Sequence, residues 1–264
     1  ERQQHLVSKV MVNTDDCWAQ VRAGRRWPET VRIRLARSAG ELQAPGCSLV
    51  YAAGPRRFFM LCADGAALVV TLDEQGAQQT ATRTPKFFDP EKDPVFESAG
   101  RRGSEWTFVS FEGNVRTRDV GSEPAKIGEP WSLFSDAERK EGWKVGGGQP
   151  VALHVASGKL YVLVHQGGVD THKQAASEIW AYDLAQKKRD WRVPVSNPMA
   201  GFLRGQMRLG HETMHDRALS WAFDHVLPNI AVESLLVTQD ASPVLVTMSL
   251  IPPAVTVHDA KTGA

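Results

Sequence analysis

Residues 142–195 decide the fold, and they read GWKVGGGQPVALHVASGKLYVLVHQGGVDTHKQAASEIWAYDLAQKKRDWRVPV. Apolar and polar residues alternate in four short segments of this stretch, and glycine, aspartate, serine and lysine cluster between the segments. Alternation with a period of two between turn-forming residues is typical of an antiparallel sheet. Four such strands in succession form one blade of a β-propeller. The predicted strands are 151–155, 160–164, 178–183 and 190–195.

The same alternation recurs on both sides of this stretch. Two segments, 182–186 and 258–263, end alike, with a strand, an aspartate at the turn, a small residue and a polar tip. This internal repeat predicts an all-β fold, a partial β-propeller of about four to five blades over residues 45–264. A turn at 261–263 leads into a further strand in such a repeat, so we expect a longer chain. The other predicted strands are 48–52, 58–61, 67–72, one that runs to about Thr84, 107–111, 114–120, 235–238, 244–249 and 254–259.

Three parts of the chain depart from the strand pattern. Residues 1–44 are rich in arginine and show no clear period, so we assign them no fold. Residues 197–233 have helical spacing and are predicted to be a helical insertion between blades. Residues 132–143 are predicted to hold a short helix, because Ser135 followed by Glu138 three residues later forms a capping box.

Composition excludes two classes of function. The chain of 264 residues carries 31 lysines and arginines against 30 aspartates and glutamates, a formal net charge of +1. A balance so close to zero gives no long-range attraction to nucleic acid or to an anionic membrane. No apolar run is long enough to span a bilayer, so neither nucleic-acid binding nor membrane insertion is predicted.

Cys47 and Cys62 flank an expected hairpin, 48–61, which contains Gly54-Pro55. Arms of equal length around a turn place the two sulfurs across from each other, within reach of a disulfide. Such a bond would indicate an oxidising compartment. The residues alone leave both a disulfide and a pair of buried thiols open.

His211-Glu212-Thr213-Met214-His215 is the sharpest motif of a catalytic kind. On a helix, His-Glu-x-x-His places two imidazoles on one face to bind zinc, and the glutamate acts as a general base. Glu233 offers a carboxylate further along the chain, but a zinc site needs its third ligand at a workable distance, and no substrate-binding edge strand is evident in the sequence. A surface helix with two solvated histidines is the alternative interpretation, and we favour it over a metal site.

His165, Asp170, His172 and Lys173 fall in one loop between two predicted strands of the same blade. Loops at the ends of propeller blades often contact ligands or partners, and the alternative is a solvated polar loop. The sequence shows no serine–histidine–aspartate set, nucleophile elbow or phosphate loop. It therefore reads as a scaffold, with no catalytic, cofactor-binding or metal residues assigned.

Several segments resemble, in order along the chain, the heavy subunit of methylamine and aromatic amine dehydrogenases. The resemblance covers most of residues 46–264. It is carried by Gly46-Cys47, 59–65, 134–139, Gly142-Trp143, Gly146-Gly147-x-Gln149, 160–163, His172-Lys173, Ala176-Ser177, 237–245 and 259–263.

The resemblance implies a seven-bladed propeller in the periplasm of Gram-negative bacteria, bound to a small light subunit. That light subunit would carry the tryptophan tryptophylquinone cofactor and the catalytic aspartate, with no cofactor in this chain. The complex would oxidise a primary amine to an aldehyde and ammonia and pass electrons to a copper protein or cytochrome c. Cys47 and Cys62 match the paired cysteines of the family, which favours the disulfide.

Two other hypotheses remain. One is a zinc-dependent hydrolase that uses His211, Glu212 and His215. The other is a propeller without an enzyme partner, which serves only as an interaction module.

Overall fold

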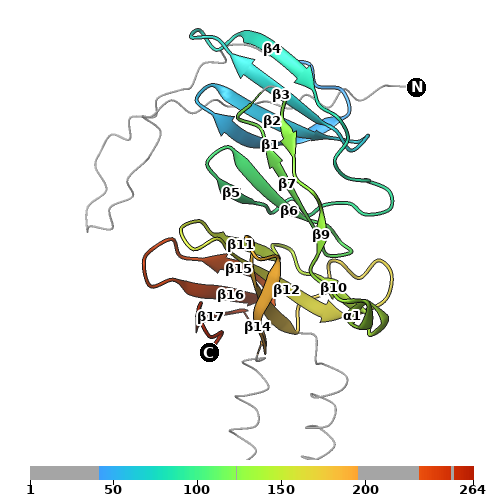
Figure 1. The fold of residues 1–264 in the computed structure, drawn as a ribbon, viewed down its shortest axis with the longest axis vertical. Coiled ribbons are helices and arrows are strands. Elements are labelled where there is room, and N and C mark those ends of the chain that lie inside the picture. The colour runs from blue at the N-terminus through green and yellow to red at the C-terminus, as the bar shows by residue number, and fades with distance from the viewer. Residues whose placement is uncertain (1–41, 123, 196–231, 251–252) are drawn as a thin grey trace, which may run out of the picture. The chain divides into compact units, whose positions relative to one another are not determined.

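A computed structural model describes residues 42–122, 124–195, 232–250 and 253–264 (Figure 1). These residues form antiparallel sheets and one helix of five residues, which confirms the all-β prediction. The chain divides into an N-terminal unit, residues 1–86, and a C-terminal unit, residues 87–264. The predicted helical insertion lies almost wholly outside the described residues, as do positions 1–41 of the unassigned segment.

The N-terminal unit holds one four-stranded sheet. Cys47 lies directly opposite Cys62 in the pairing of the first two strands, and the two side chains form a disulfide. The disulfide that the family resemblance favoured is therefore confirmed. Phe58, Met60 and Val70 pack around it in the core of this unit. The strands are β1 (Cys47–Gly54), β2 (Arg57–Cys62), β3 (Ala67–Leu72) and β4 (Gln78–Arg83).

The C-terminal unit holds three antiparallel sheets. The first consists of β5 (Gly100–Arg102), β6 (Glu105–Val109), β7 (Asn114–Asp119), β8 (Lys126–Ile127) and β9 (Trp131–Ser132). The second consists of β10 (Trp143–Val145), β11 (Val151–His154), β12 (Lys159–Gln166), β13 (Glu178–Asp183) and β14 (Lys188–Pro194). The third consists of β15 (Val232–Val237), β16 (Val244–Leu250) and β17 (Pro253–Asp259).

The second sheet contains the four strands predicted from 142–195, and β10 as well. Both β10 and β11 pair with the same edge of β12, so they form one innermost strand that residues 146–150 interrupt. Gly147 has a φ of 114°, a value that favours glycine, and this residue turns the chain out of the ladder. The predicted helix is shorter than expected, since α1 covers Asp136–Lys140 and Trp143 already belongs to β10.

The three sheets of the C-terminal unit stack face to face. One apolar core joins Val115 and Phe134, at the first sheet, to Val162 and Trp180 of the second. A separate core joins the opposite face of the second sheet to β15 and β16 of the third. Neighbouring sheets also meet at their innermost strands, where Gln149 forms a parallel bridge with Ser234. Antiparallel sheets that stack face to face with adjoining inner strands are the packing of propeller blades, so the described residues form a partial, unclosed β-propeller.

Three turns that follow a strand hold an aspartate, and the repeat predicted two of them, Asp183 and Asp259. The carboxylates of Asp73, Asp183 and Asp259 each accept hydrogen bonds from backbone N–H groups two to four residues further along the chain. Those bonds favour the ionised carboxylate and lower the pKa of Asp183 and Asp259 below its usual value. Each aspartate therefore fixes the reversal of the chain after the third strand of its sheet.

Reduction of the Cys47–Cys62 disulfide is expected to lower the free energy of unfolding of the N-terminal unit by about 3 kcal/mol. The reason is that the bond joins cysteines 15 residues apart and restricts the unfolded chain. Hydrogen exchange of the β1–β4 amides in denaturant, with and without reductant, measures the loss. The double variant Cys47→Ala/Cys62→Ala should be equally destabilised and indifferent to reductant. If reductant destabilises that variant too, another thiol is responsible.

Candidate functional site

The loop between β12 and β13 lies at the end of the blades where the innermost strands begin. The ring of His172 stacks on Phe111, from the β6–β7 hairpin, with centroids 3.9 Å apart and planes 16° apart. The N–H of Gly147 donates to the carbonyl of His172 at 3.1 Å. Next to this contact, Lys144 forms an ion pair of 2.7 Å with Glu112. Two neighbouring blades thus hold the loop in place. We call the surface at this end of the blades the loop face, and it consists of Phe111, Glu112, Lys144 and residues 167–174.

The four residues predicted in this loop region differ in their exposure. Asp170 and Lys173 are exposed, His172 is half-buried, and His165 is buried with only 2% of its surface accessible. Beside Asp170, Val169 leaves 83% of its surface exposed. The loop face therefore presents one exposed apolar side chain and two opposite charges, while His165 is buried.

His165 supports the loop from inside the blade. Its Nε2 lies 3.0 Å from the hydroxyl of Thr171, and its Nδ1 has no hydrogen-bond partner among the residues that the structure describes. The ring packs against the backbone of Gly146, where a Cβ atom would collide with it. Burial lowers the pKa of the imidazole, and the charge of Lys144 lowers it further. A neutral His165 is thus part of the packing that orders residues 167–174.

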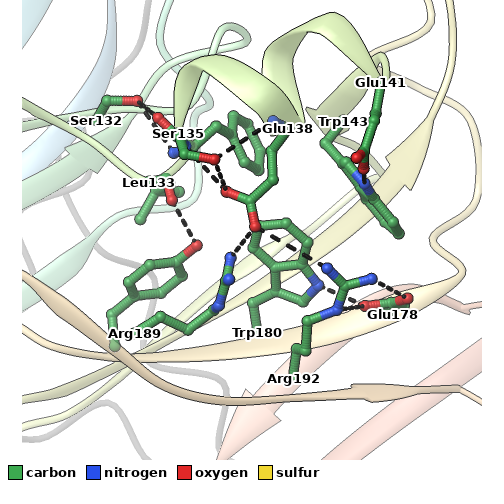
Figure 2. Close-up of polar contacts among 12 residues, drawn as sticks. Ser132, Leu133, Ser135, Glu138, Glu141, Trp143, Glu178, Trp180, Arg189 and Arg192 are labelled. Carbon is green, nitrogen blue, oxygen red and sulfur yellow. Dashed lines mark hydrogen bonds and ion pairs between the residues drawn. The ribbon is translucent and has the colours of Figure 1, made fainter.

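A second cluster was not predicted from the sequence, and it joins α1 to the outer strands of the second sheet. Figure 2 shows Glu138 pointing from α1 toward two arginines of β14. Glu138 pairs with Arg189 at 2.6 Å, and Arg192 pairs with Glu178 at 2.9 Å. Burial disfavours the charge of Glu138, but hydrogen bonds from Ser135 and Arg189 outweigh it and lower the pKa of the carboxyl.

The two arginines also cover a pair of tryptophans. Trp143 and Trp180 lie with ring centroids 5.0 Å apart, and the Arg192 guanidinium stands 4.8 and 4.9 Å from the two centroids. The Arg189 guanidinium lies 4.3 Å from the Trp180 centroid. Because each carboxylate and guanidinium of this cluster has a partner, its chemistry is structural: it holds α1 and β14 against the blade. The predicted Ser135–Glu138 capping box is present and orients Glu138 toward Arg189.

The predicted zinc motif, His211, Glu212 and His215, lies outside the described residues. Within the ranges that the structure describes, no group of three or more histidine, cysteine, aspartate or glutamate side chains is arranged to hold a metal ion. The same ranges contain no helix long and apolar enough to cross a membrane.

Glu138→Gln is expected to lower the free energy of unfolding of the C-terminal unit by about 2 kcal/mol at neutral pH, because Arg189 loses a charged partner. In the wild type, the stability that the ionised Glu138 contributes is complete above 4.5, the ordinary pKa of the carboxyl group. This stability is lost as the pH falls through the lowered pKa of Glu138 in the fold. The variant should therefore lose less stability on acidification. Glu105→Gln, which breaks the exposed pair with Arg102, is the control and should cost less than about 0.5 kcal/mol in denaturant unfolding. Equal losses in the two variants would contradict the assignment.

His165 is expected to make the stability of the C-terminal unit rise with pH and level off above its ordinary pKa of 6.5. Its pKa is lowered in the fold, so the unfolded state binds the proton more readily, and stability is lost as the pH falls below 6.5. The pH dependence of unfolding should weaken in His165→Gln. NMR titration provides the direct check, since a His165 imidazole that titrates above 6.5 would be inconsistent with this account.

Comparison with known proteins gives this geometry a family context. The family model for the methylamine dehydrogenase heavy chain (MADH) matches residues 36–202. The methylamine dehydrogenase heavy chain of Paracoccus versutus is 27% identical over 84% of this chain and 44% of the relative. That of Methylorubrum extorquens is 25% identical over 84% of this chain and 46% of the relative. That of Methylophilus methylotrophus is 27% identical over 59% of this chain and 38% of the relative.

The chain thus spans less than half the length of these curated relatives. Among solved structures, the β-propeller domain of Cps50 (Swd1) from Myceliophteria thermophila overlaps 81% of this chain and 54% of its own length. Its TM-score is 0.47 and its sequence identity 7%. The family model covers more than half of the chain, including the disulfide hairpin and the blade of residues 142–195. The chain belongs to the methylamine dehydrogenase heavy chain family.

Proposed function

We propose that this chain forms part of the β-propeller of the heavy subunit in a periplasmic quinoprotein amine dehydrogenase. The observation that carries the proposal is the family match over residues 36–202, which includes the blade of residues 142–195. In this role the chain is a scaffold for a light subunit. The light subunit would carry the tryptophan tryptophylquinone cofactor and the catalytic groups, so no residue of this chain is assigned to catalysis.

The reaction of the assembled enzyme would be the oxidative deamination of a primary amine to an aldehyde and ammonia. The electrons removed from the amine would pass through the quinone of the light subunit to a copper protein or cytochrome c. The clusters described in the C-terminal unit suit a supporting role, because Glu138 and Glu178 are already paired with arginines. Side chains engaged in this way stabilise a surface rather than react with a substrate.

A periplasmic location is supported by the Cys47–Cys62 disulfide. Disulfides persist in oxidising compartments and are rare where thioredoxin and glutathione keep thiols reduced. This bond cross-links the first two strands of a sheet, where it contributes to the stability of the N-terminal unit.

The loop face is the surface that we assign to the light subunit. Its exposed Val169 is followed along the chain by the exposed charges of Asp170 and Lys173, and apolar side chains together with a charged rim are typical of protein interfaces. The His172–Phe111 stack and the Thr171–His165 bond fix the loop before a partner arrives. A loop that is ordered in advance loses less conformational entropy on binding.

Co-expression with a methylamine dehydrogenase light subunit tests the proposed function. We expect a stable complex in a pull-down and amine-dependent reduction of a dye by that complex. Recovery of the folded chain without any bound light subunit would refute the scaffold role and favour a propeller that serves only as an interaction module.

Charge reversal at the loop face tests the assigned surface separately. Asp170→Lys/Lys173→Glu is expected to weaken the complex by more than about tenfold, because complementary charges at the rim set both affinity and specificity. Lys187→Glu is the matched control, since Lys187 lies in the turn at the opposite end of β13. Titration calorimetry or surface plasmon resonance gives the affinities. Equal weakening by the control would remove the loop face from the interface.

A further inference from the structure

Arg118 of β7 is a buried cation without a counter-ion. Its side chain has 0% of its surface accessible, and none of its three guanidinium nitrogens has a hydrogen-bond partner among the residues that the structure describes. Burial lowers the pKa of the guanidinium to about 10, so the group still carries its charge at neutral pH. A charged group held away from water without a partner is strongly disfavoured, and it calls for a bound ion or water.

Arg116 shows what an arginine on this face of the sheet requires. It stands two residues before Arg118 on β7, so the two side chains project to the same side of the sheet. The Arg116 guanidinium donates to Oδ2 of Asp93 at 3.2 Å and to the carbonyl of Phe87 at 3.1 Å. The described residues thus supply acceptors for Arg116 and leave the guanidinium of Arg118 without one.

Aromatic side chains surround the charge of Arg118. The ring of Phe87 lies over the guanidinium, with 4.7 Å between the guanidinium carbon and the ring centroid. Trp106 is the cross-strand neighbour of Arg118, and its ring stacks on Phe108 with centroids 6.3 Å apart. A ring face stabilises a cation but leaves its N–H groups without acceptors. Because these rings carry no charge, a single negative charge would neutralise the site, and a second one would stay unpaired.

Access to the guanidinium depends on Phe87. The nitrogens of Arg118 are out of contact with solvent, so an anion reaches them only when a covering side chain moves. Phe87 lies between β4 and β5, outside the strands, and its ring is the group that covers the guanidinium. Rotation of this ring would exchange a cation–π contact for charge-assisted hydrogen bonds, which satisfy N–H groups that the ring cannot.

We propose that Arg118 binds a small carboxylate with one negative charge, and that the ring of Phe87 moves to admit it. The planar guanidinium presents parallel N–H donors that fit the two oxygens of a carboxylate. Formate is the probe, because it has this geometry and adds only one further heavy atom. The proposal does not depend on the enzyme role, since it concerns a group within the C-terminal unit and no light subunit.

Isothermal titration calorimetry of the 264-residue chain with sodium formate tests the proposal, with sodium sulfate to hold the ionic strength constant. We expect one site per chain. At ten times the dissociation constant, formate should raise the ratio of folded to unfolded C-terminal unit about tenfold in urea. Hydrogen exchange of the β6 and β7 amides measures this ratio.

Arg118→Met should abolish both the heat of binding and the gain in stability. Without formate it should be at least as stable as the wild type, because an apolar side chain replaces a buried charge without a partner. Arg118→Lys keeps the charge but loses the planar donor pair, so it should raise the dissociation constant by more than about tenfold. This second variant preserves the test if the first one does not fold.

Arg101→Met is the matched control. Arg101 also lies over an aromatic ring of this sheet, that of Trp106, but it is exposed, so its loss should leave formate binding unchanged. Formate that stabilises Arg118→Met as much as the wild type would overturn the proposal, since the effect would then be that of a salt on the whole surface. A wild-type chain that neither binds formate nor gains stability from it would overturn it as well.

Discussion

The packing of one sheet, β10–β14, on both of its faces is the constraint on which the rest of the C-terminal unit depends. Residues of β12 alternate between two cores, with Val162 and Val164 on one side and Tyr161 and Leu163 on the other. All four are almost fully buried, and burial of each large apolar side chain is worth roughly 1.5–3 kcal/mol. A sheet that is apolar on both faces is stable only between two other layers. The stacking of blades thus follows from the composition of this one strand.

The break in the innermost strand of that sheet links packing to the surface. Gly146 and Pro150 still bond to Leu163 of β12, and residues 147–149 between them leave its ladder. The N–H of Gly147 therefore donates to the carbonyl of His172, and the N–H of Gln149 donates to the carbonyl of Glu233. A continuous strand would use these groups within its own sheet. The interruption therefore ties the loop face to its own blade through His172, and it joins that blade to the next one through Gln149. A proposed partner surface that is carried on a loop gains its rigidity from the core in this way.

The sequence predicted most strands because period-two alternation and aspartate turns are local properties. The disulfide was open on residues alone and was favoured by family resemblance. Strand β10 was missed, since three residues carry too little periodicity. The cluster of Glu138, Arg189 and Trp180 was also missed. Arg189 lies 51 positions and Trp180 42 positions from Glu138 along the chain, and only the fold brings the three residues together. The burial of His165 was missed for a similar reason, because it depends on the backbone of Gly146, which packs against the imidazole ring and leaves no room for a Cβ atom.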